Sequence, residues 1–266
     1  MKKSYIILAL AALASVSCAR YSVEQQIEKI YQHAAADTTT LMTLDKIERN
    51  LPERASGTQD NSDAADYLAM LADKEAKISN IWSQNIGDGT DHNIVAELKN
   101  KKSTGNVIIV SAAVNNWTDT LGVNHDNAAA CVAALKVVET LKSLGLNGHN
   151  TVRLLLYQDG EGTHDGLREY ASIAKEKDET TLMQMDITSE NDESNIFHIG
   201  ENPRIFDELV KVVPPYLEKY GPYEFVNRKA ITAEWPVKAP CYSYNVNKAT
   251  LDKDIAAIAS LIYLLN

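Results

Sequence analysis

The stretch spanning residues 106–166 constrains the fold most, because it reads as two buried strands joined by a helix. Residues 107–110 and 152–157 are short apolar runs rich in β-branched side chains, which suits strands buried on both faces. Residues 128–144 are apolar at helical spacing and precede Gly145, a common helix stop. Strands joined in this way lie parallel in one sheet, with a right-handed crossover. The sequence therefore predicts an α/β fold, a three-layer α/β/α sandwich with a mostly parallel central sheet.

Polar side chains follow each of these strands. Asn115 and Asn116 come after the first strand, and Asp159 and Glu161 come after the second. Asp126 directly precedes the helix between them. Open α/β sheets build their sites at the carboxyl ends of their strands. We therefore expect these side chains to face one cleft at that edge of the sheet.

The remaining patterns supply further elements around this unit. Amphipathic spacing predicts helices, and short alternating or apolar runs predict strands. The expected helices cover residues 23–35, 41–47, 60–76, 167–176 and 251–265, with a further helix over 203–220 that Pro214 and Pro215 break. The expected strands cover residues 78–86, 94–98, 182–187 and 241–246.

Composition indicates one globular, acidic domain. Charged residues make up 23% of the 266-residue chain and apolar residues 45%, and the net charge is −10. No stripe of Lys or Arg is present, which argues against nucleic acid as a partner. We find no repeat or low-complexity linker, so residues 19–266 are expected to form a single domain.

Residues 1–18 are typical of an export signal. Lys2 and Lys3 precede an apolar run too short to span a bilayer, and small residues then lead to Cys18. A Cys after such a site resembles a bacterial lipobox, although Ser15 stands where Leu is more usual. We expect an exported cell-envelope lipoprotein on the periplasmic or surface side, touching the membrane only through a lipid on Cys18. The alternative is ordinary secretion with Cys18 lost or free.

Two further cysteines, Cys131 and Cys241, fall in the central helix and in a late strand. Both are expected to be small buried side chains. The sequence leaves open a disulfide between them.

Several segments in order resemble one family. They are NLPERASGTQDNSDAADYL, HNIVAELKN, DNAAACVAALKVVETLKSLGL, TVRLLLYQDGEG and APCYSYNV. Together they resemble the co-catalytic zinc exopeptidases of clan MH, specifically the branch of aminopeptidases and carboxypeptidase Q-like enzymes. The resemblance runs from about Leu44 to the C-terminus and implies the phosphorylase/hydrolase type of α/β/α sandwich.

The resemblance implies a pair of zinc ions, but several of the residues that would bind them are missing. The family's first His ligand aligns with Ala113, and the Asp that orients it aligns with Asn115. The bridging aspartate aligns with Asp126. Such two-metal sites hold ions ~3.5–4 Å apart and depend on a complete ligand set.

The second half of the implied site is also incomplete. Glu161 matches the general base and Asp186 matches a metal ligand, whereas Gly162 stands where another Glu ligand would be. The last His ligand has no counterpart, because no His occurs between Val246 and Asn266. We therefore interpret Glu161 as a vestigial base, and Asp126 and Asp186 as vestigial ligands.

Two histidines offer a route to a rebuilt site. His125 adjoins Asp126, and His164 follows Glu161, so either could join Asp126 and Asp186 around one metal. The alternative is that His125 is a turn residue and His164 a surface or capping residue. Asp126 could likewise persist as a helix cap. Core packing or a peptide pocket would each explain the nearby aromatic residues, Trp117, Tyr157, Trp235 and Tyr242.

These observations favour a non-catalytic peptidase homologue that binds a peptide or protein partner in the former active-site cleft. No cofactor is expected on this interpretation. The alternative is an active metallo-exopeptidase with a rebuilt zinc site and Glu161 as its base. A third reading, a purely structural envelope protein, also remains open.

Overall fold

The computed structural model describes residues 21–266, apart from residues 79, 88, 100–102, 119–123, 147, 161–162, 190–194, 201–202 and 228–235. Its centre is an eight-stranded sheet with the order β1-β2-β6-β3-β7-β10-β8-β9. The strands are β1 (Asn80–Asn85), β2 (His92–Leu98), β3 (Val107–Ala113), β6 (Thr151–Tyr157), β7 (Thr181–Thr188), β8 (Ile196–Ile199), β9 (Glu224–Asn227) and β10 (Cys241–Asn245). A separate short hairpin pairs β4 (Trp117–Thr118) with β5 (Asn124–His125).

The middle of the sheet is parallel. Strand β3 pairs in parallel with both β6 and β7, and β7 pairs in parallel with β10. The edges are mixed, because β1 with β2, β2 with β6, and β10 with β8 are antiparallel. The predicted mostly parallel sheet is therefore found at its centre, within a sheet that is mixed as a whole.

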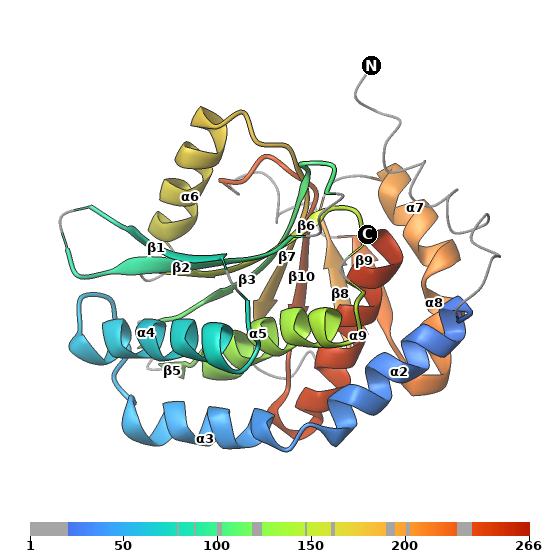
Figure 1. Cartoon of the computed structure of the whole chain (residues 1–266), viewed down its shortest axis with the longest axis horizontal. Helices are drawn as coiled ribbons and strands as arrows, with labels where there is room; N and C mark the ends of the chain where they lie inside the picture. Colours follow the sequence, from blue (N-terminus) through green and yellow to red (C-terminus); the bar gives the residue numbers. More distant parts are fainter. Residues whose placement is uncertain are drawn as a thin grey trace.

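Most helices cover one face of the sheet (Figure 1). These are α2 (Val23–Ala36), α3 (Thr39–Asn50), α4 (Gln59–Lys74), α5 (Ala128–Ser143) and α9 (Leu251–Leu265). Helix α5 connects the parallel neighbours β3 and β6 and is buried on nearly every side. The large hydrophobic core lies between these helices and the sheet.

Helix α6 (Asp165–Glu176) covers the opposite face, where a smaller cluster of apolar side chains packs. In Figure 1 it lies over the β1-β2 side of the sheet. Layers on both faces complete the predicted three-layer α/β/α sandwich, which is confirmed.

The Pro-rich helix is broken as expected. Helix α7 (Pro203–Val212) ends before Pro214, and α8 (Pro214–Leu217) and a 3-10 turn, η1 (Glu218–Tyr220), follow. Tyr220 stacks on Tyr31 of α2, with ring centroids 3.6 Å apart. This aromatic contact ties the segment to the first helix.

The cysteines and the N-terminal segment were also subjects of prediction. Cys131 and Cys241 are both buried, as predicted, and both are free thiols, which settles the open question of a disulfide. The predicted signal segment and Cys18 lie outside the described residues. No helix of the described part has the length and apolar character to cross a membrane.

Candidate functional site

The polar side chains predicted to meet at the sheet edge come from neighbouring strands. Asp186 on β7 lies opposite Ser111 on β3, and Ala113 on β3 lies opposite Tyr157 on β6. Asp126 lies beside the end of β7, because the hydroxyl of Ser189 donates a hydrogen bond to its carbonyl oxygen. The parallel register thus brings Asp126 and Asp186 to the same edge of the sheet.

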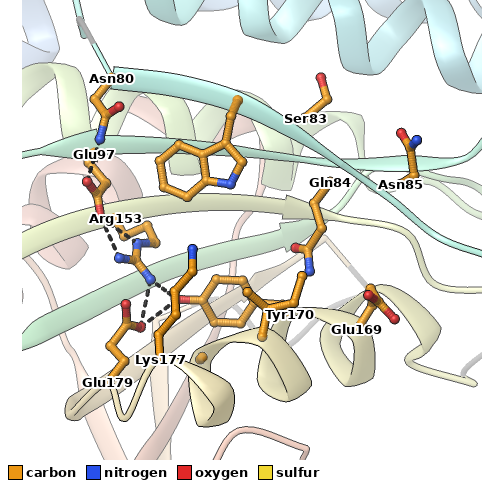
Figure 2. A pocket seen from close by; sticks show the side chains of 13 residues that line it. Asn80, Ser83, Gln84, Asn85, Glu97, Arg153, Glu169, Tyr170, Lys177 and Glu179 are labelled. Carbon is orange, nitrogen blue, oxygen red and sulfur yellow. Dashed lines mark hydrogen bonds and ion pairs between the residues drawn. The ribbon is translucent and has the colours of Figure 1, made fainter.

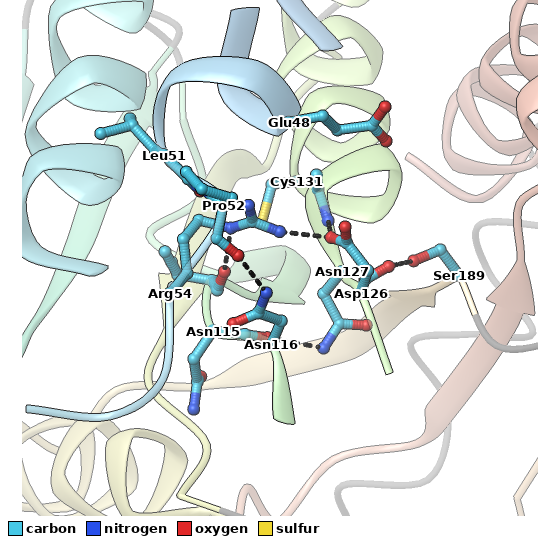
Figure 3. A network of polar contacts seen from close by, with 12 residues as sticks. Glu48, Leu51, Pro52, Arg54, Asn115, Asn116, Asp126, Asn127, Cys131 and Ser189 are labelled. Atoms are coloured by element: carbon cyan, nitrogen blue, oxygen red, sulfur yellow. Dashed lines mark hydrogen bonds and ion pairs between the residues drawn. The ribbon is translucent and has the colours of Figure 1, made fainter. Parts of the chain in front are cut away.

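Asp126 is held by an arginine from the N-terminal part of the domain (Figure 3). The Nη2 group of Arg54 forms an ion pair with Oδ1 of Asp126. The backbone N–H of Ala128 donates to the same oxygen at 2.9 Å. Asp126 therefore accepts the first backbone N–H of α5 and balances a buried positive charge, but the N-cap position itself belongs to Asn127, whose side chain makes no capping bond.

Arg54 is 1% exposed and is fixed by backbone carbonyls as well as by Asp126. It donates to the carbonyl oxygens of Leu51 at 2.7 Å and Val114 at 3.4 Å. The backbone N–H of Asn116 donates to the carbonyl of Arg54 at 3.0 Å. The guanidinium has little freedom to leave Asp126, because this carboxylate and two backbone carbonyl groups bind it.

Asp186 is bound by hydroxyl groups inside the sheet. The hydroxyl of Ser111 donates to its Oδ1 at 2.7 Å, and the hydroxyl of Tyr157 lies 3.4 Å from Oδ2. Burial, the dominant cause, raises the pKa of Asp186 to about 7, while the hydrogen bond from Ser111 opposes that rise. Nearby, the positive charge of His164 lowers the pKa of Asp186 and the negative charge of Asp159 raises it. This carboxyl can hold a proton near neutral pH.

The position that the resemblance assigns to the family's first His ligand, Ala113, carries only a methyl group. Ala113 is buried, and the thiol of Cys131 donates to its carbonyl oxygen at 2.9 Å. Asn115, which replaces the orienting Asp, has a different task. Its Nδ2 donates to the carbonyl of Asp159, and its Oδ1 accepts from the N–H of Asp159 at 2.7 Å. An amide can do both, whereas an ionised carboxylate can only accept.

The two candidate histidines have local partners. His164 precedes α6 in a left-handed conformation, with φ of 54°. Its N–H donates to Oδ1 of Asp159 at 2.9 Å, and its Nδ1 lies 3.1 Å from Oδ2 of that residue. That hydrogen bond raises the pKa of His164. His125 stacks on Trp117, with ring centroids 4.0 Å apart. His164 thus occupies the N-cap position of α6 without a side-chain capping bond, and His125 lies on strand β5 rather than in a turn.

The other predicted residues divide between core and undescribed segments. Tyr157 and Tyr242 are almost fully buried, which suits core packing better than an open peptide pocket. Glu161, Gly162 and Trp235 lie outside the described residues.

The donors that the structure does bring together do not fit a metal ion. Among the described residues, no group of three or more His, Cys, Asp or Glu side chains is arranged to hold one. Asp126 faces a guanidinium and Asp186 faces hydroxyls, so neither presents a free carboxylate beside a nitrogen ligand. Sequence reasoning missed the roles of Arg54 and Ser111. Arg54 lies in the first of the segments that resemble the family, NLPERASGTQDNSDAADYL. No residue near it in the sequence indicated that its partner would be Asp126.

Comparison with known proteins places this geometry in context. The model of the family described as peptidase family M28 matches residues 93–232, just over half of the chain. Carboxypeptidase Q from Xenopus laevis is 25% identical over 161 residues, which cover 57% of this chain and 33% of that protein. The chain thus spans about a third of that relative's length.

Solved structures resemble the whole fold. LapA from Legionella pneumophila has a TM-score of 0.70 at 10% identity, covering 94% of this chain and 77% of LapA. A leucine aminopeptidase precursor from Bacteroides thetaiotaomicron has a TM-score of 0.62 at 13% identity, covering 85% and 96%. At these identities the similarity concerns the fold alone.

Proposed function

The chain belongs to peptidase family M28, and from that premise we propose that it is a non-catalytic homologue that binds a peptide or protein partner in the former active-site cleft. The relatives named above carry the names of a carboxypeptidase and an aminopeptidase, which supports peptides as the proposed class of ligand. The proposal differs from the activities in those names in one respect, namely that the bound peptide is not hydrolysed.

One observation carries the proposal: both surviving ligand carboxylates are already bound by the chain's own groups. Arg54 and the N–H of Ala128 take one oxygen of Asp126. Ser111 and Tyr157 bind the two oxygens of Asp186. A cation entering here would have to displace a buried guanidinium, and breaking a buried ion pair costs about 3–5 kcal/mol.

The missing donors support the same conclusion. Zinc in catalytic sites takes at least three protein ligands of the His, Cys or carboxylate type. Ala113 and Gly162 supply none, and no His follows Val246. Removing groups that merely orient a ligand already costs ~10–100-fold in affinity or activity, and here ligands themselves are absent.

The test of the chemistry is metal analysis of purified protein that has been saturated with zinc and then dialysed. We expect less than one zinc ion per chain, and no chelator-sensitive hydrolysis of aminoacyl or dipeptide substrates. Two zinc ions per chain together with chelator-sensitive hydrolysis would refute the proposal. A single ion lost on combining Asp126→Asn with His125→Ala or His164→Ala would instead establish the rebuilt site.

Ligand binding needs a separate measurement. Trp117 stacks on His125 beside Asp126 and is partly exposed, so its fluorescence should report an occupied cleft. We expect dipeptides to change the emission of the wild-type protein in a saturable way, and the Trp117→Phe variant to lose that response. A response unchanged by Trp117→Phe would place binding elsewhere. The absence of any saturable response would favour the structural reading.

We also propose that the protein is an exported envelope lipoprotein attached through Cys18. The basic start, the apolar run and the small residues before Cys18 support this. Cys18→Ser should move the protein from the membrane fraction of a bacterial host to the soluble fraction, and Cys131→Ser should not. An unchanged distribution of the Cys18→Ser protein would reject lipidation at this residue.

A further inference from the structure

A groove lies between strand β1 and helix α6 (Figure 2), and neither Asp126 nor Asp186 lines it. It encloses a cavity of about 680 Å³. Trp82 and Gln84 contribute from β1, and Tyr170 and Ile173 contribute from α6. Ser83 and Asn85 also line the cavity, although their side chains point away from it in Figure 2. Their contribution is therefore the main chain of β1, so the groove reaches the edge of the sheet.

Strand β1 is the terminal strand of the sheet, and its outer edge has no strand partner among the described residues. Its pairing with β2 is regular over all six residues, Asn80 to Asn85, without a bulge. The strand sequence NIWSQN contains no charged residue and no proline. Proteins usually protect an open edge with bulges, charged residues or proline, because its unpaired N–H and C=O groups can otherwise pair with another strand. The edge of β1 is thus available for pairing.

Gln84 provides a second, independent sign of a ligand. Its side chain is 8% exposed, and its Oε1 accepts a hydrogen bond from Nδ2 of Asn93 at 3.2 Å. Its Nε2 has no hydrogen-bond partner within the described part of the chain. Buried donors are nearly always satisfied. An unsatisfied one that lines a groove points to an acceptor supplied by a bound molecule.

The floor of the groove is built around one arginine and its partners. The guanidinium of Arg153 pairs with Glu97 and, at 2.7 Å, with Glu179, and it also donates to the hydroxyl of Tyr170. Trp82 lies over the same guanidinium, 5.7 Å from its ring centroid. One guanidinium against two carboxylates leaves one excess negative charge, so this cluster does not favour an anionic ligand. The floor offers an aromatic surface together with one neutral donor.

We propose that the groove binds an extended peptide segment of a partner protein, which adds as a strand to the free edge of β1 and places the carbonyl of an Asn or Gln side chain against Nε2 of Gln84. This is the mode of recognition in which main-chain bonds give affinity and alternate side chains give specificity. It uses residues remote from Asp126 and Asp186 and does not rest on the function proposed for the cleft.

A second copy of this chain is a poorer occupant than a foreign peptide. Two copies paired edge to edge through β1 would each present Trp82 and Gln84 to the other. The Oε1 of each Gln84 already accepts one hydrogen bond from Asn93, so the Nε2 of its counterpart would have to share that oxygen. A foreign peptide can instead bring Nε2 an acceptor that has no other donor.

The test uses a phage-displayed library of random peptides, selected on the wild-type protein and counter-selected on Gln84→Glu. This substitution keeps the acceptor for Asn93 and replaces the free donor with an anion, so it removes no internal hydrogen bond. Synthetic copies of the recovered peptides should bind Gln84→Glu about tenfold or more weakly, a change of about 1.4 kcal/mol. Ser172→Glu adds the same charge on an exposed position of α6 outside the groove and should bind as wild type does.

Hydrogen exchange gives a readout specific to strand addition. Saturating peptide should slow exchange of the amides of β1. The proposal is overturned if no peptide is enriched over the counter-selection, or if the peptides bind both proteins equally. It is also overturned if the protected amides lie elsewhere, or if light scattering shows that β1 is occupied by a second copy. A cleft peptide of the kind proposed above would be insensitive to Gln84→Glu, so the two proposals can fail separately.

Discussion

Asn115 shows how much depends on the choice between an amide and a carboxylate. It is 1% exposed and joins the end of β3 to the loop after β6 through a donor and an acceptor on one side chain. By resemblance, the family has an Asp here that orients a His ligand, and that ligand aligns with Ala113. In this chain Asn115 fastens two loops instead.

Restoring the Asp should destabilise the protein. In Asn115→Asp the carboxylate cannot donate to the carbonyl of Asp159, and it would be buried beside the Asp159 side chain. We expect the free energy of unfolding to fall by about 2 kcal/mol, as when a buried acceptor loses its partner. Urea denaturation would measure it. Asn116→Asp serves as the control, because it loses a single hydrogen bond to Pro52 that is more exposed to solvent, and it should lower the unfolding free energy less. An equal loss of unfolding free energy in the two variants would contradict the role assigned to Asn115.

Asp186 should make stability depend on pH. Its pKa is about 7 in the folded protein, against about 4 for an unperturbed Asp. The folded state therefore binds a proton that the unfolded state releases between these values. The resulting stabilisation is fully present below about pH 4 and is lost as pH rises through 7, with an upper size on the order of 4 kcal/mol.

Denaturation of chelator-treated protein between pH 4 and 8 would test this. The unfolding free energy of the wild type should decline across that range relative to Asp186→Asn, which has no proton to lose. His164, whose raised pKa acts in the same direction, is present in both proteins, so the comparison isolates Asp186. Parallel profiles for the two proteins would show that Asp186 is ionised throughout.

At the scale of elements, helix α6 packs closely on the sheet because Gly166 at its start has no side chain. A Cβ at Gly166 would lie 2.6 Å from the backbone nitrogen of Gln158 and 2.7 Å from its carbonyl oxygen. It would also meet the side chain of Asn93, whose Nδ2 donates to the carbonyl of Gly166 at 2.8 Å. The start of α6 thus touches the end of β6 directly.

Gly166→Ala should push α6 away from the sheet. Overpacking of this kind costs about 1–3 kcal/mol, which exceeds the gain of about 1 kcal/mol from a better helix former. We expect a lower melting temperature by thermal unfolding. Ser172→Ala, on the exposed side of the same helix, should leave the melting temperature unchanged or raise it slightly. A Gly166→Ala protein as stable as wild type would mean that α6 shifts without cost.

The periodic elements could be predicted because their own residues define them. The stretch from 107 to 157 gave β3, α5 and β6 within a residue or a few of their observed ends, and Pro214 marked the break after α7. Strands β8 and β9 were not predicted. Each has only four residues, and β9 (EFVN) follows a run of helix and turn with no alternating pattern of its own. Their pairing depends on contacts made only in the folded sheet.

The candidate site divides in the same way. Asp126 was singled out by its place before the central helix, and Asp186 by the family resemblance. The partners of these residues could not be predicted, because Arg54 is distant in sequence from Asp126 and Ser111 is distant from Asp186. Ion pairs and hydrogen bonds between remote segments leave no periodic trace in a single sequence.

At the scale of the whole molecule, two cores of unequal size lie on the two faces of the sheet. Helix α5 is buried along almost all its length, whereas α6 buries only Gly166, Leu167 and Tyr170. Regions with few buried apolar contacts open at a lower free energy than the global value. The face that carries the groove should therefore be the more easily opened one.

Native-state hydrogen exchange should resolve this difference. We expect the amides of α6 to exchange through an opening whose free energy is lower, and less sensitive to denaturant, than that of α5 and α9. The isotherms of α5 and α9 should merge with global unfolding. Identical behaviour of α6 and α5 would show that the two faces open as one unit.

Helix α9 has a further consequence for how this chain comes to be folded. Eleven of its residues are buried against α2, α5 and the sheet, yet it follows β10 near the C-terminal end of the sequence. A chain that leaves a ribosome or a membrane pore N-terminus first cannot close its main core until α9 has emerged. Before that moment α2 and α5 lack the surface they pack on, and exposed apolar faces of this kind invite aggregation or chaperone binding. The main core can therefore be completed only after α9 has emerged.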